Sequence, residues 1–334
     1  MTTGTSVFTC RVWRNGDVVT HPIAVHRISE EIADPGSLVW VDLVDPSPQD
    51  LALLAAEVGL AAAAVEDAVA PHERPKVTRH EGHLFFTAYA TDLPDRPADG
   101  DGSHGRLTLR RVSGFLTEFG LITVRLDDGL DLAPVLARWD DNRDLLRHGP
   151  GALMHGLLDV LVDGHFDTIQ ALDDGIEGLE DELFAERRTG SDFQRHVYGL
   201  RKDLVALRRV VLPMREVVNG LLRHRKGGDE LDGLYDDLYD HVLRASEWTE
   251  SLRDMVTSVF ETNLSLQDAR LNVVMKKLAG WAAIIAVPTA VTGWFGQNVP
   301  YPGFDQAWGV WQSGGLIVVL SVVLYAVMRR HDWI

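Results

Sequence analysis

A line of polar and small side chains near the end of the chain has a composition suited to contact with cations. Its members alternate at spacings of four and three residues: Glu261, Ser265, Asp268, Asn272, Met275, Ala279, Ala282, Ala286, Thr289, Gly293 and Gly296. A seam at this spacing normally carries Leu or Ile, so carboxylates, amides and small residues would leave the axis of a helix ring wet or narrow. Close packing of membrane helices explains Ala282, Ala286 and Gly293 equally well. It explains Asp268 and Asn272 poorly, and we interpret the line as an ion path.

Two long apolar runs lie in the same part of the chain. The first, Leu278–Phe295, overlaps this line, and the second, Gly309–Met328, follows it. A stretch of about 18 or more apolar residues matches the ~30 Å hydrocarbon core of a bilayer, and buried helices of soluble domains seldom stay uncharged for so long. The sequence therefore predicts a transmembrane hairpin. Its parts are a first helix at 278–298, a periplasmic loop at 299–307, a second helix at 308–328 and a basic tail at 329–334.

Charges beside the two runs indicate the orientation of the hairpin. Lys276 and Lys277 precede the first run, Arg329 and Arg330 follow the second, and Asp305 is the only charge in the loop between them. Basic flanks stay in the cytoplasm, so we expect both termini to be cytoplasmic and the protein to lie in the cell (inner) membrane. Aromatic residues fall near the expected interfaces, where amphipathic rings are favoured, although packed helix ends would give the same pattern: Trp294, Tyr301, Trp308, Trp311 and Trp333.

The composition of the chain indicates which classes of partner it can bind. The 334 residues carry 32 Lys and Arg against 49 Asp and Glu, a net charge of -17, and 46% are hydrophobic. The hydrophobic content is ample for a packed core of about two domains. The acidic balance disfavours nucleic acid and anionic lipid and favours cations, although many acidic residues are simply solvated surface. Cys10 is the only cysteine, which rules out an internal disulfide or a thiolate metal cluster. The N-terminus of the chain has neither a basic leader nor an apolar run, so we expect no cleaved signal peptide.

The first part of the chain, residues 1–148, reads as an α/β domain. Short runs with β-branched and aromatic content predict strands at Val7–Trp13, Leu38–Leu43, Leu84–Tyr89, Leu107–Leu116 and Leu121–Val124. Helical content and period predict helices at Gln49–Gly59, Ala61–Ala70 and Leu132–Arg147, with Pro94–Gly105 as an exposed loop.

Residues 149–277 show only long helical patterns and form the predicted stalk region. Helices are expected at Ala152–Arg187 and Ser191–Lys226, with breaks at Thr189-Gly190 and Gly227-Gly228. A third begins near Asp229 and continues to Phe295, which at 1.5 Å per residue would make about 100 Å. Pro288 lies where neighbouring helices can tolerate a kink. A helix of that length needs cover from the other helices and from copies of itself.

His80 and His83 form a His-x-x-His pair that suggests a metal site. They flank a turn at Gly82 and have no Cys or third ligand nearby, so we interpret them as exposed turn residues. The sequence contains no Gly-rich phosphate loop, nucleophile elbow or His-Glu-x-x-His helix. We therefore expect no enzyme.

With these motifs in place, the chain resembles the CorA-type divalent-cation channel family. Matching residues in the second half are Tyr239-Asp240-His241, Asn263, Asn272, Met275-Lys276-Lys277-Leu278, Pro288, Gly293, Gly296 and Asn298. Those in the first half are Trp40-Val41-Asp42-Leu43, Val65-Glu66-Asp67 and His72-Glu73-Arg74-Pro75-Lys76. The resemblance implies a cytoplasmic αβα sandwich, long stalk helices and a two-helix membrane hairpin, assembled as a homopentameric funnel.

The resemblance also implies a pathway for hydrated Mg²⁺, with Co²⁺ and Ni²⁺ as further candidate cargo. Mg²⁺ gives up its water reluctantly, so amides and carbonyls that bond the first-shell waters suit it. The implied selectivity filter is Gly296, Gln297 and Asn298. The implied pore-lining residues are Asp268, Asn272, Met275, Leu278, Thr289 and Gly293, among which Met275 and Leu278 lie near a hydrophobic constriction. Ordinary helix packing explains Met275 and Leu278 equally well.

A regulatory Mg²⁺ site is implied as well, between carboxylates of adjacent subunits. Glu66 and Asp67 would form one half and Asp237 of the neighbouring copy the other, with Asp159, Asp163, His72 and His241 at nearby positions. Carboxylates brought together repel one another unless a cation lies between them, so the ion would hold a closed state. A solvated helix face is the alternative interpretation of Asp237.

The chain departs from the family pattern at the filter. Gln297 replaces the Met of the family's Gly-Met-Asn, and the loop Val299–Asp305 lacks its Met-Pro-Glu-Leu. Asp305 is a candidate replacement for the missing loop carboxylate. Three alternatives follow: a transporter of Zn²⁺, Co²⁺ or Ni²⁺, which the lack of Cys or His along the seam disfavours; a proton-coupled transporter; and a non-conducting cation sensor.

Overall fold

The structure is a computed structural model that describes residues 7–14, 17–19, 36–94, 105–118, 120–184, 191–224 and 230–334. The chain divides into two compact units, Met1–Thr257 and Ser258–Ile334. The first unit contains a mixed sheet with helices on both faces, and the second contains the apolar end of one long helix and a further apolar helix. The expected breaks at 189–190 and 227–228, the helix start at 229 and most of the loop at 94–105 lie outside the described residues.

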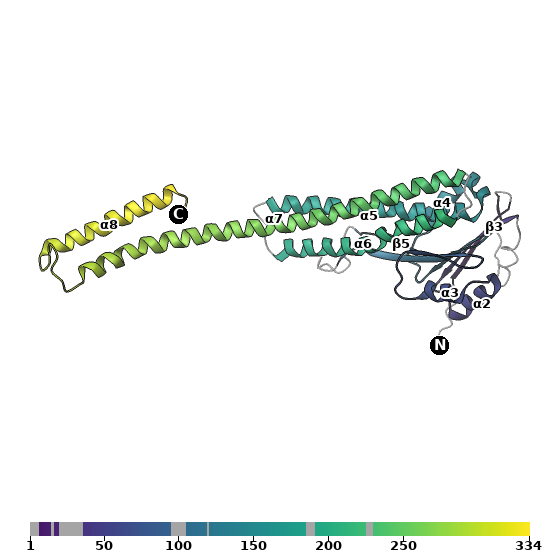
Figure 1. Ribbon diagram of the computed structural model, residues 1–334, viewed down its shortest axis with the longest axis horizontal. Helices are drawn as coiled ribbons and strands as arrows, with labels where there is room; N and C mark the ends of the chain where they lie inside the picture. The colour runs from purple at the N-terminus through teal and green to yellow at the C-terminus, as the bar shows by residue number, and fades with distance from the viewer. Residues whose placement is uncertain are drawn as a thin grey trace. The chain divides into compact units, whose positions relative to one another are not determined.

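The described part of the first unit contains a seven-stranded sheet in the order β2-β1-β3-β7-β6-β5-β4 (Figure 1). The strands are β1 Val7–Arg14, β2 Asp17–Val19, β3 Ser37–Val44, β4 Lys76–Arg79, β5 Leu84–Asp92, β6 Thr108–Leu116 and β7 Gly120–Arg125. Neighbouring strands are antiparallel except β3 and β7, which are parallel. All five predicted strands are confirmed. The structure adds β2 and β4, two short strands at the sheet edges, with side chains that are half-buried or exposed.

Helices follow the predicted order with one exception. They are α2 Pro48–Val58, α3 Ala62–Val69, α4 Ala133–Asp141, the short 3₁₀-helix η2 Arg143–His148, α5 Pro150–Phe184, α6 Ser191–His224, α7 Glu230–Phe295 and α8 Ala307–Arg330. The single helix predicted at Leu132–Arg147 is wrong, because it breaks at Asn142. The Asn142 side-chain amide donates to the Arg138 carbonyl at 2.9 Å, next to the Asn142 backbone N–H at 3.2 Å, and so ends α4 locally.

The two faces of the sheet bury different helices, which confirms the αβα sandwich. Alternate residues of β3 point to opposite sides, as the period of two requires. Val39 and Val41 pack in one core with α2 and α3. Leu38 and Trp40 pack in the other core with α4 to α7. The Trp40 ring lies edge-on to the Trp139 ring at 5.1 Å, which joins the sheet to α4.

An ion pair is buried where β3 and β7 run parallel. The Arg125 guanidinium lies 2.6 Å from the Asp42 carboxylate, and the two side chains are 7% and 1% exposed. The Thr123 hydroxyl also donates to Asp42, at 2.6 Å. Buried charges persist only when they are paired and hydrogen-bonded in this way. The Asp42 of the Trp-Val-Asp-Leu motif therefore has a structural role in the sheet.

The prediction for the His-x-x-His pair is wrong for His83. Its side chain is only 6% exposed, packs edge-on against the Phe115 ring and stacks on His80 at 5.1 Å. Burial lowers the pKa of His83, and the neighbouring His80 lowers it further. Apolar contacts on the sheet, which the local sequence around Gly82 does not reveal, place this ring inside.

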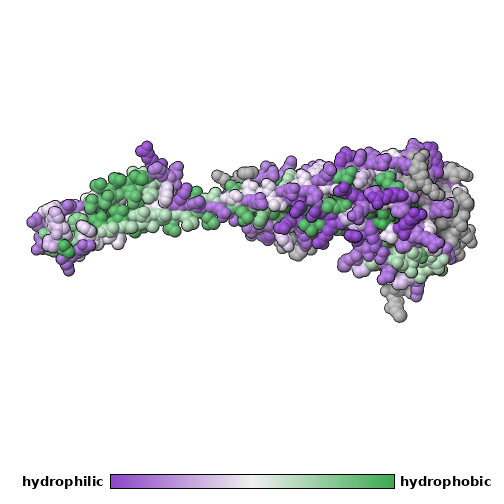
Figure 2. Space-filling model, viewed as in Figure 1, coloured by the Kyte–Doolittle hydropathy of each residue, from purple (hydrophilic) through white to green (hydrophobic). Residues whose placement is uncertain are grey.

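The second unit consists of the last part of α7, a loop and α8. Both α7 and α8 contain a segment long and apolar enough to cross a membrane. Large apolar side chains on them face outward, among them Leu278 at 70% and Trp311 at 83% exposed. Figure 2 shows the hydrophobic surface gathered over α8 and the end of α7. Pro288 lies inside α7 without ending it. Close to the chain end, Gly280 approaches Ile334, where an added Cβ would lie 3.0 Å from the Ile334 side chain.

Candidate cation path and carboxylate pocket

The polar line predicted from spacing lies along one uninterrupted helix. All the implied pore-lining residues belong to α7, and in the single chain each of them is exposed: Asp268, Asn272, Met275, Leu278, Thr289 and Gly293. The Met275 side chain is 69% exposed although it is apolar. An apolar group left open in this way indicates a surface that lipid or another copy covers. The whole line is therefore open in the single chain.

The tripeptide that ends this line follows α7 directly. The Gly296 N–H donates to the Thr292 carbonyl at 2.8 Å, and the Gln297 N–H donates to the Trp294 carbonyl at 3.3 Å. These bonds extend the helical pattern into the turn. Gly296, Gln297 and Asn298 are all exposed. An added Cβ at Gly296 would lie 3.0 Å from the Thr292 carbonyl oxygen, so the glycine permits a close backbone approach.

Tyr301 fixes the loop that follows, a role that sequence reasoning missed. Its hydroxyl donates to the Phe295 carbonyl at 2.9 Å, immediately before the tripeptide. Its ring lies edge-on to Phe295 at 5.0 Å and to Phe304 at 5.3 Å. A helix leaves its last carbonyl groups without intrahelical partners, and Tyr301 satisfies one of them. Asp305, the candidate loop carboxylate, is exposed and has a positive φ of 63°.

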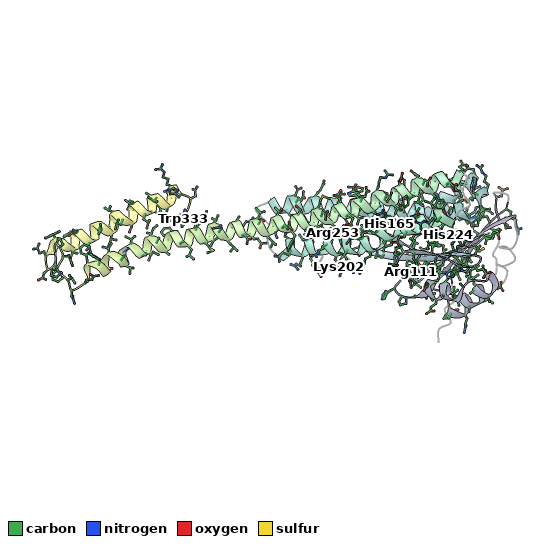
Figure 3. The ribbon with its side chains drawn as sticks, viewed as in Figure 1. Arg111, His165, Lys202, His224, Arg253 and Trp333 are labelled. Carbon is green, nitrogen blue, oxygen red and sulfur yellow. The ribbon has the colours of Figure 1, made fainter. Side chains whose placement is uncertain are left out.

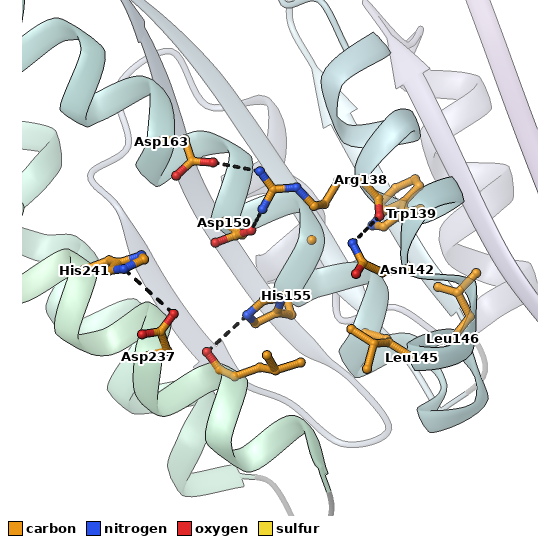
Figure 4. Close-up of a pocket in the computed structure, with 13 residues that line it drawn as sticks. Arg138, Trp139, Asn142, Leu145, Leu146, His155, Asp159, Asp163, Asp237 and His241 are labelled. Carbon is orange, nitrogen blue, oxygen red and sulfur yellow. Dashed lines mark hydrogen bonds and ion pairs between the residues drawn. The ribbon is translucent and has the colours of Figure 1, made fainter.

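In the first unit, a pocket gathers four of the implied metal ligands. Asp159 and Asp163 of α5 face Asp237 and His241 of α7 across it (Figure 4). The His241 ring nitrogen Nε2 lies 3.8 Å from the Asp237 carboxylate. Arg138 of α4 enters the same pocket. Its guanidinium forms an ion pair with Asp159 and a second one with Asp163, at 2.8 Å.

The other three implied ligands lie away from this pocket. Glu66 and Asp67 belong to α3, on the opposite face of the sheet, and His72 follows in the next loop. The Lys76 ammonium lies 2.7 Å from Asp67 and 2.8 Å from Glu73. Partial burial alone lowers the pKa of Lys76, but the hydrogen bonds to these two carboxylates outweigh it and the pKa is raised. Glu66 and His72 are exposed.

In the part of the chain that the structure describes, the carboxylates of one copy do not form a complete metal site. Within the described ranges, no group of three or more His, Cys, Asp or Glu side chains is arranged to hold a metal ion. Lys76 already balances Asp67, and Arg138 balances Asp159 and Asp163. A divalent cation at any of these carboxylates therefore needs ligands from another copy, or must compete with a side-chain cation.

Two membrane-length helices, an exposed line of polar and small residues along one of them, and a folded α/β unit define an integral membrane protein suited to moving ions. A model of the CorA-like Mg²⁺ transporter protein family matches residues 35–330, and the chain belongs to this family. It is accordingly a membrane transporter of divalent cations and not an enzyme.

Individual relatives are named for the transport of different ions. The chain is 28% identical over 306 residues to the cobalt/magnesium transport protein CorA of Thermotoga maritima, covering 90% of this chain and 85% of that one. It is 29% identical over 272 residues to the zinc transport protein ZntB of Yersinia pseudotuberculosis, covering 78% and 77%. The complete CorA structure from Methanocaldococcus jannaschii has a TM-score of 0.74 at 23% identity, covers 97% and 98% of the two chains, and supports the fold. Membership thus establishes divalent-cation transport but not the ion.

Proposed function

We propose that the protein is a channel that admits hydrated Mg²⁺, and also Co²⁺ or Ni²⁺, into the cytoplasm down the electrochemical gradient. The observation that carries this proposal is the unbroken α7 line that leads to an exposed Gly296-Gln297-Asn298 turn. The Asn298 amide, repeated around a ring, can hydrogen-bond the first-shell waters of the ion without stripping them. The absence of Cys and His from the line favours a hard, hydrated ion over a dehydrated soft one.

The channel of this proposal is a homopentamer, with both termini in the cytoplasm. The exposed apolar side chains of α7 and α8 support assembly in a bilayer, because neither helix buries them in the single chain. Lys276 and Lys277 precede the first span, and Arg329 and Arg330 follow the second. Two spans place both pairs on the same side, and basic flanks stay in the cytoplasm, which supports the orientation. The number of copies comes from the resemblance.

Cytoplasmic Mg²⁺ would close the channel at carboxylates shared between copies. Glu66 and Asp67 of one subunit would meet Asp237 of the next. The Asp237 and Asp67 side chains are 67% and 38% exposed, so both are accessible to another copy. Carboxylates at such an interface repel one another until a cation binds between them, which links closure to the ion that has entered. The transported product would thus limit its own uptake.

Zinc transport is the second candidate. It is favoured by the similarity to ZntB and by Gln297, which changes the chemistry of the tripeptide. A proton-coupled mechanism and a non-conducting cation sensor are the remaining alternatives. They differ in one measurable property, the flux of each ion with and without a pH gradient.

The test is ion uptake into proteoliposomes, measured with an indicator for Mg²⁺ and repeated with Zn²⁺, Co²⁺, Ni²⁺ and an imposed pH gradient. Asn298→Ala should reduce Mg²⁺ uptake about tenfold or more, because each lost amide contact is worth about 1 kcal/mol and recurs in every copy. Gln312→Ala is the matched control, since it removes an exposed amide from α8, away from the line. Flux of Zn²⁺ alone would favour the second candidate, flux that requires the pH gradient would favour the proton-coupled transporter, and no flux of any ion would favour the sensor.

A further inference from the structure

The Arg138 guanidinium lies between two carboxylates that the family resemblance places at a cation site. Asp159 and Asp163 are one turn apart on α5, where like charges repel one another. Arg138 forms an ion pair with each of them, and Figure 4 shows its guanidinium directed between the two. Asp159 is the more enclosed, at 15% side-chain exposure against 51% for Asp163. One fixed positive charge therefore joins both carboxylates.

The fold holds Arg138 in this place through its neighbours. The adjacent Trp139 is buried, and its indole N–H donates to the Leu153 carbonyl at 3.1 Å. The Trp139 ring lies against Gly156, where an added Cβ would be only 2.7 Å from the indole nitrogen. The Asn142 side-chain amide donates to the Arg138 carbonyl at 2.9 Å. Packing of α4 directly on α5 thus sets the guanidinium against the carboxylates.

We infer that Arg138 takes the place that a divalent cation would occupy between Asp159 and Asp163. Arginine keeps its charge at every accessible pH, and its planar guanidinium can bond two carboxylates at once. A divalent ion that enters this pocket, which Asp237 also lines, must displace the guanidinium or bind beside it. Arg138 therefore holds Asp159 and Asp163 together without a bound ion, and the pocket has a low affinity for a divalent ion. This inference deepens the proposed regulation and rests on it, because it assigns ion sensing to Glu66 and Asp237, and to Asp67, where an ion must compete with Lys76.

The experiment compares Arg138→Gln with wild type, as full-length protein in detergent. Mn²⁺ is the probe for binding, and the melting temperature is read with EDTA and with Mg²⁺. Without divalent ions, Arg138→Gln should melt a few degrees lower, because two carboxylates one turn apart lose their counter-charge. Mg²⁺ should raise its melting temperature about 3 °C more than that of wild type. It should bind Mn²⁺ about tenfold more tightly, because the competing charge is gone. Arg138→Lys, which keeps the charge, should stay close to wild type.

Arg143→Gln is the matched control, because Arg143 is 55% exposed and lies 3.6 Å from Asp140, outside the Asp159–Asp163 pair. Equal Mn²⁺ affinity in Arg138→Gln and wild type, or an equal gain in Arg143→Gln, would overturn the inference. If Arg138→Gln does not fold, the double variant Arg138→Gln/Asp163→Asn removes the repulsion as well. It should then fold again, and failure to do so would overturn the inference too. None of these readouts uses flux, so a failed transport assay would count against the proposed function only.

Discussion

The two units of the chain treat apolar side chains in opposite ways. In the first unit, Trp40 and Trp139 are each 2% exposed and pack together between sheet and helices. In the second, Trp311 and Leu278 are 83% and 70% exposed on helices that bury almost none of their membrane-length segments. Burial of apolar area is the main favourable term in folding. The first unit thus completes its own core, whereas the second leaves its apolar surface for the lipid of a membrane, or for further copies in the proposed channel, to cover.

Polar groups show the same contrast. Asp42 and Arg125 of the first unit are paired inside the protein, and Arg138 joins two carboxylates of the pocket. Asp268 and Asn272 of the second unit are exposed along α7. Charges that stabilise a fold are neutralised within the chain, whereas in the proposed channel groups that contact a passing ion must stay accessible. The paired side chains of the first unit are therefore structural, and the exposed ones on α7 remain available for the proposed transport.

A matched pair of tryptophan substitutions tests the contrast most strongly. Trp40→Ala removes a buried ring and its hydrogen bond to Thr123 at 3.2 Å, and should destabilise the first unit by about 3–5 kcal/mol. Trp311→Ala removes an exposed ring and should change the free energy of unfolding by no more than about 0.5 kcal/mol. Urea unfolding of the full chain in detergent, followed by circular dichroism, measures both. Comparable losses in the two variants would contradict the division between a self-contained core and an open one.

The pH dependence of stability should come in part from His165, a histidine inside the first unit. His165 lies on α5 (Figure 3). It is 1% exposed and donates its Nε2–H to the Tyr89 carbonyl at 2.8 Å. Burial lowers the pKa of His165 from 6.5 to about 4. The unfolded chain therefore binds a proton more readily, so stability is fully present above pH 6.5 and falls as the pH drops toward 4. The full difference amounts to about 3 kcal/mol.

Replacing His165 should flatten that pH dependence. His165→Gln keeps a side-chain donor for the Tyr89 carbonyl but has no group that titrates. Its loss of stability between pH 7 and pH 4.5 should be about 2 kcal/mol smaller than that of wild type. His224→Gln, at an exposed position on α6, is the control and should leave the profile unchanged. If His165→Gln follows the wild-type profile, the histidine does not remain neutral in the folded protein.

Sequence periodicity predicts the elements that have strong patterns of their own. The apolar strands and the long helices, including α7 through Pro288, follow from that pattern. The edge strands β2 and β4 have too few buried side chains to show alternation. The break at Asn142 depends on one side-chain hydrogen bond, and the burial of His83 depends on Phe115 across the sheet. Contacts of this kind arise only when the chain has folded.

The candidate site also has one part that follows from pattern within a single element and another that depends on contacts between elements. The polar line follows from helical spacing alone, because α7 carries all of it except Gly296, in the turn that follows directly. The pocket does not, because Arg138 reaches Asp159 only through the packing of α4 on α5. Similarly, Tyr301 has the residue type of an interface aromatic, and only the folded loop shows its bond to Phe295. Sequence thus predicts ligands within one element and misses the residues that position them from another.

The smallest predicted effect tests whether the second unit contains any fixed structure of its own near the tripeptide. Tyr301→Phe removes the hydroxyl bonded to the Phe295 carbonyl and keeps the ring contacts with Phe295 and Phe304. The loss should destabilise the loop by about 1 kcal/mol. In proteoliposomes we expect weaker discrimination between Mg²⁺ and Co²⁺ with little change in total flux, because the turn before Asn298 loses a constraint and no apolar contact. Tyr325→Phe, on α8, is the control. Unaltered discrimination in Tyr301→Phe would mean that neighbouring copies, and not this loop, hold the tripeptide in place.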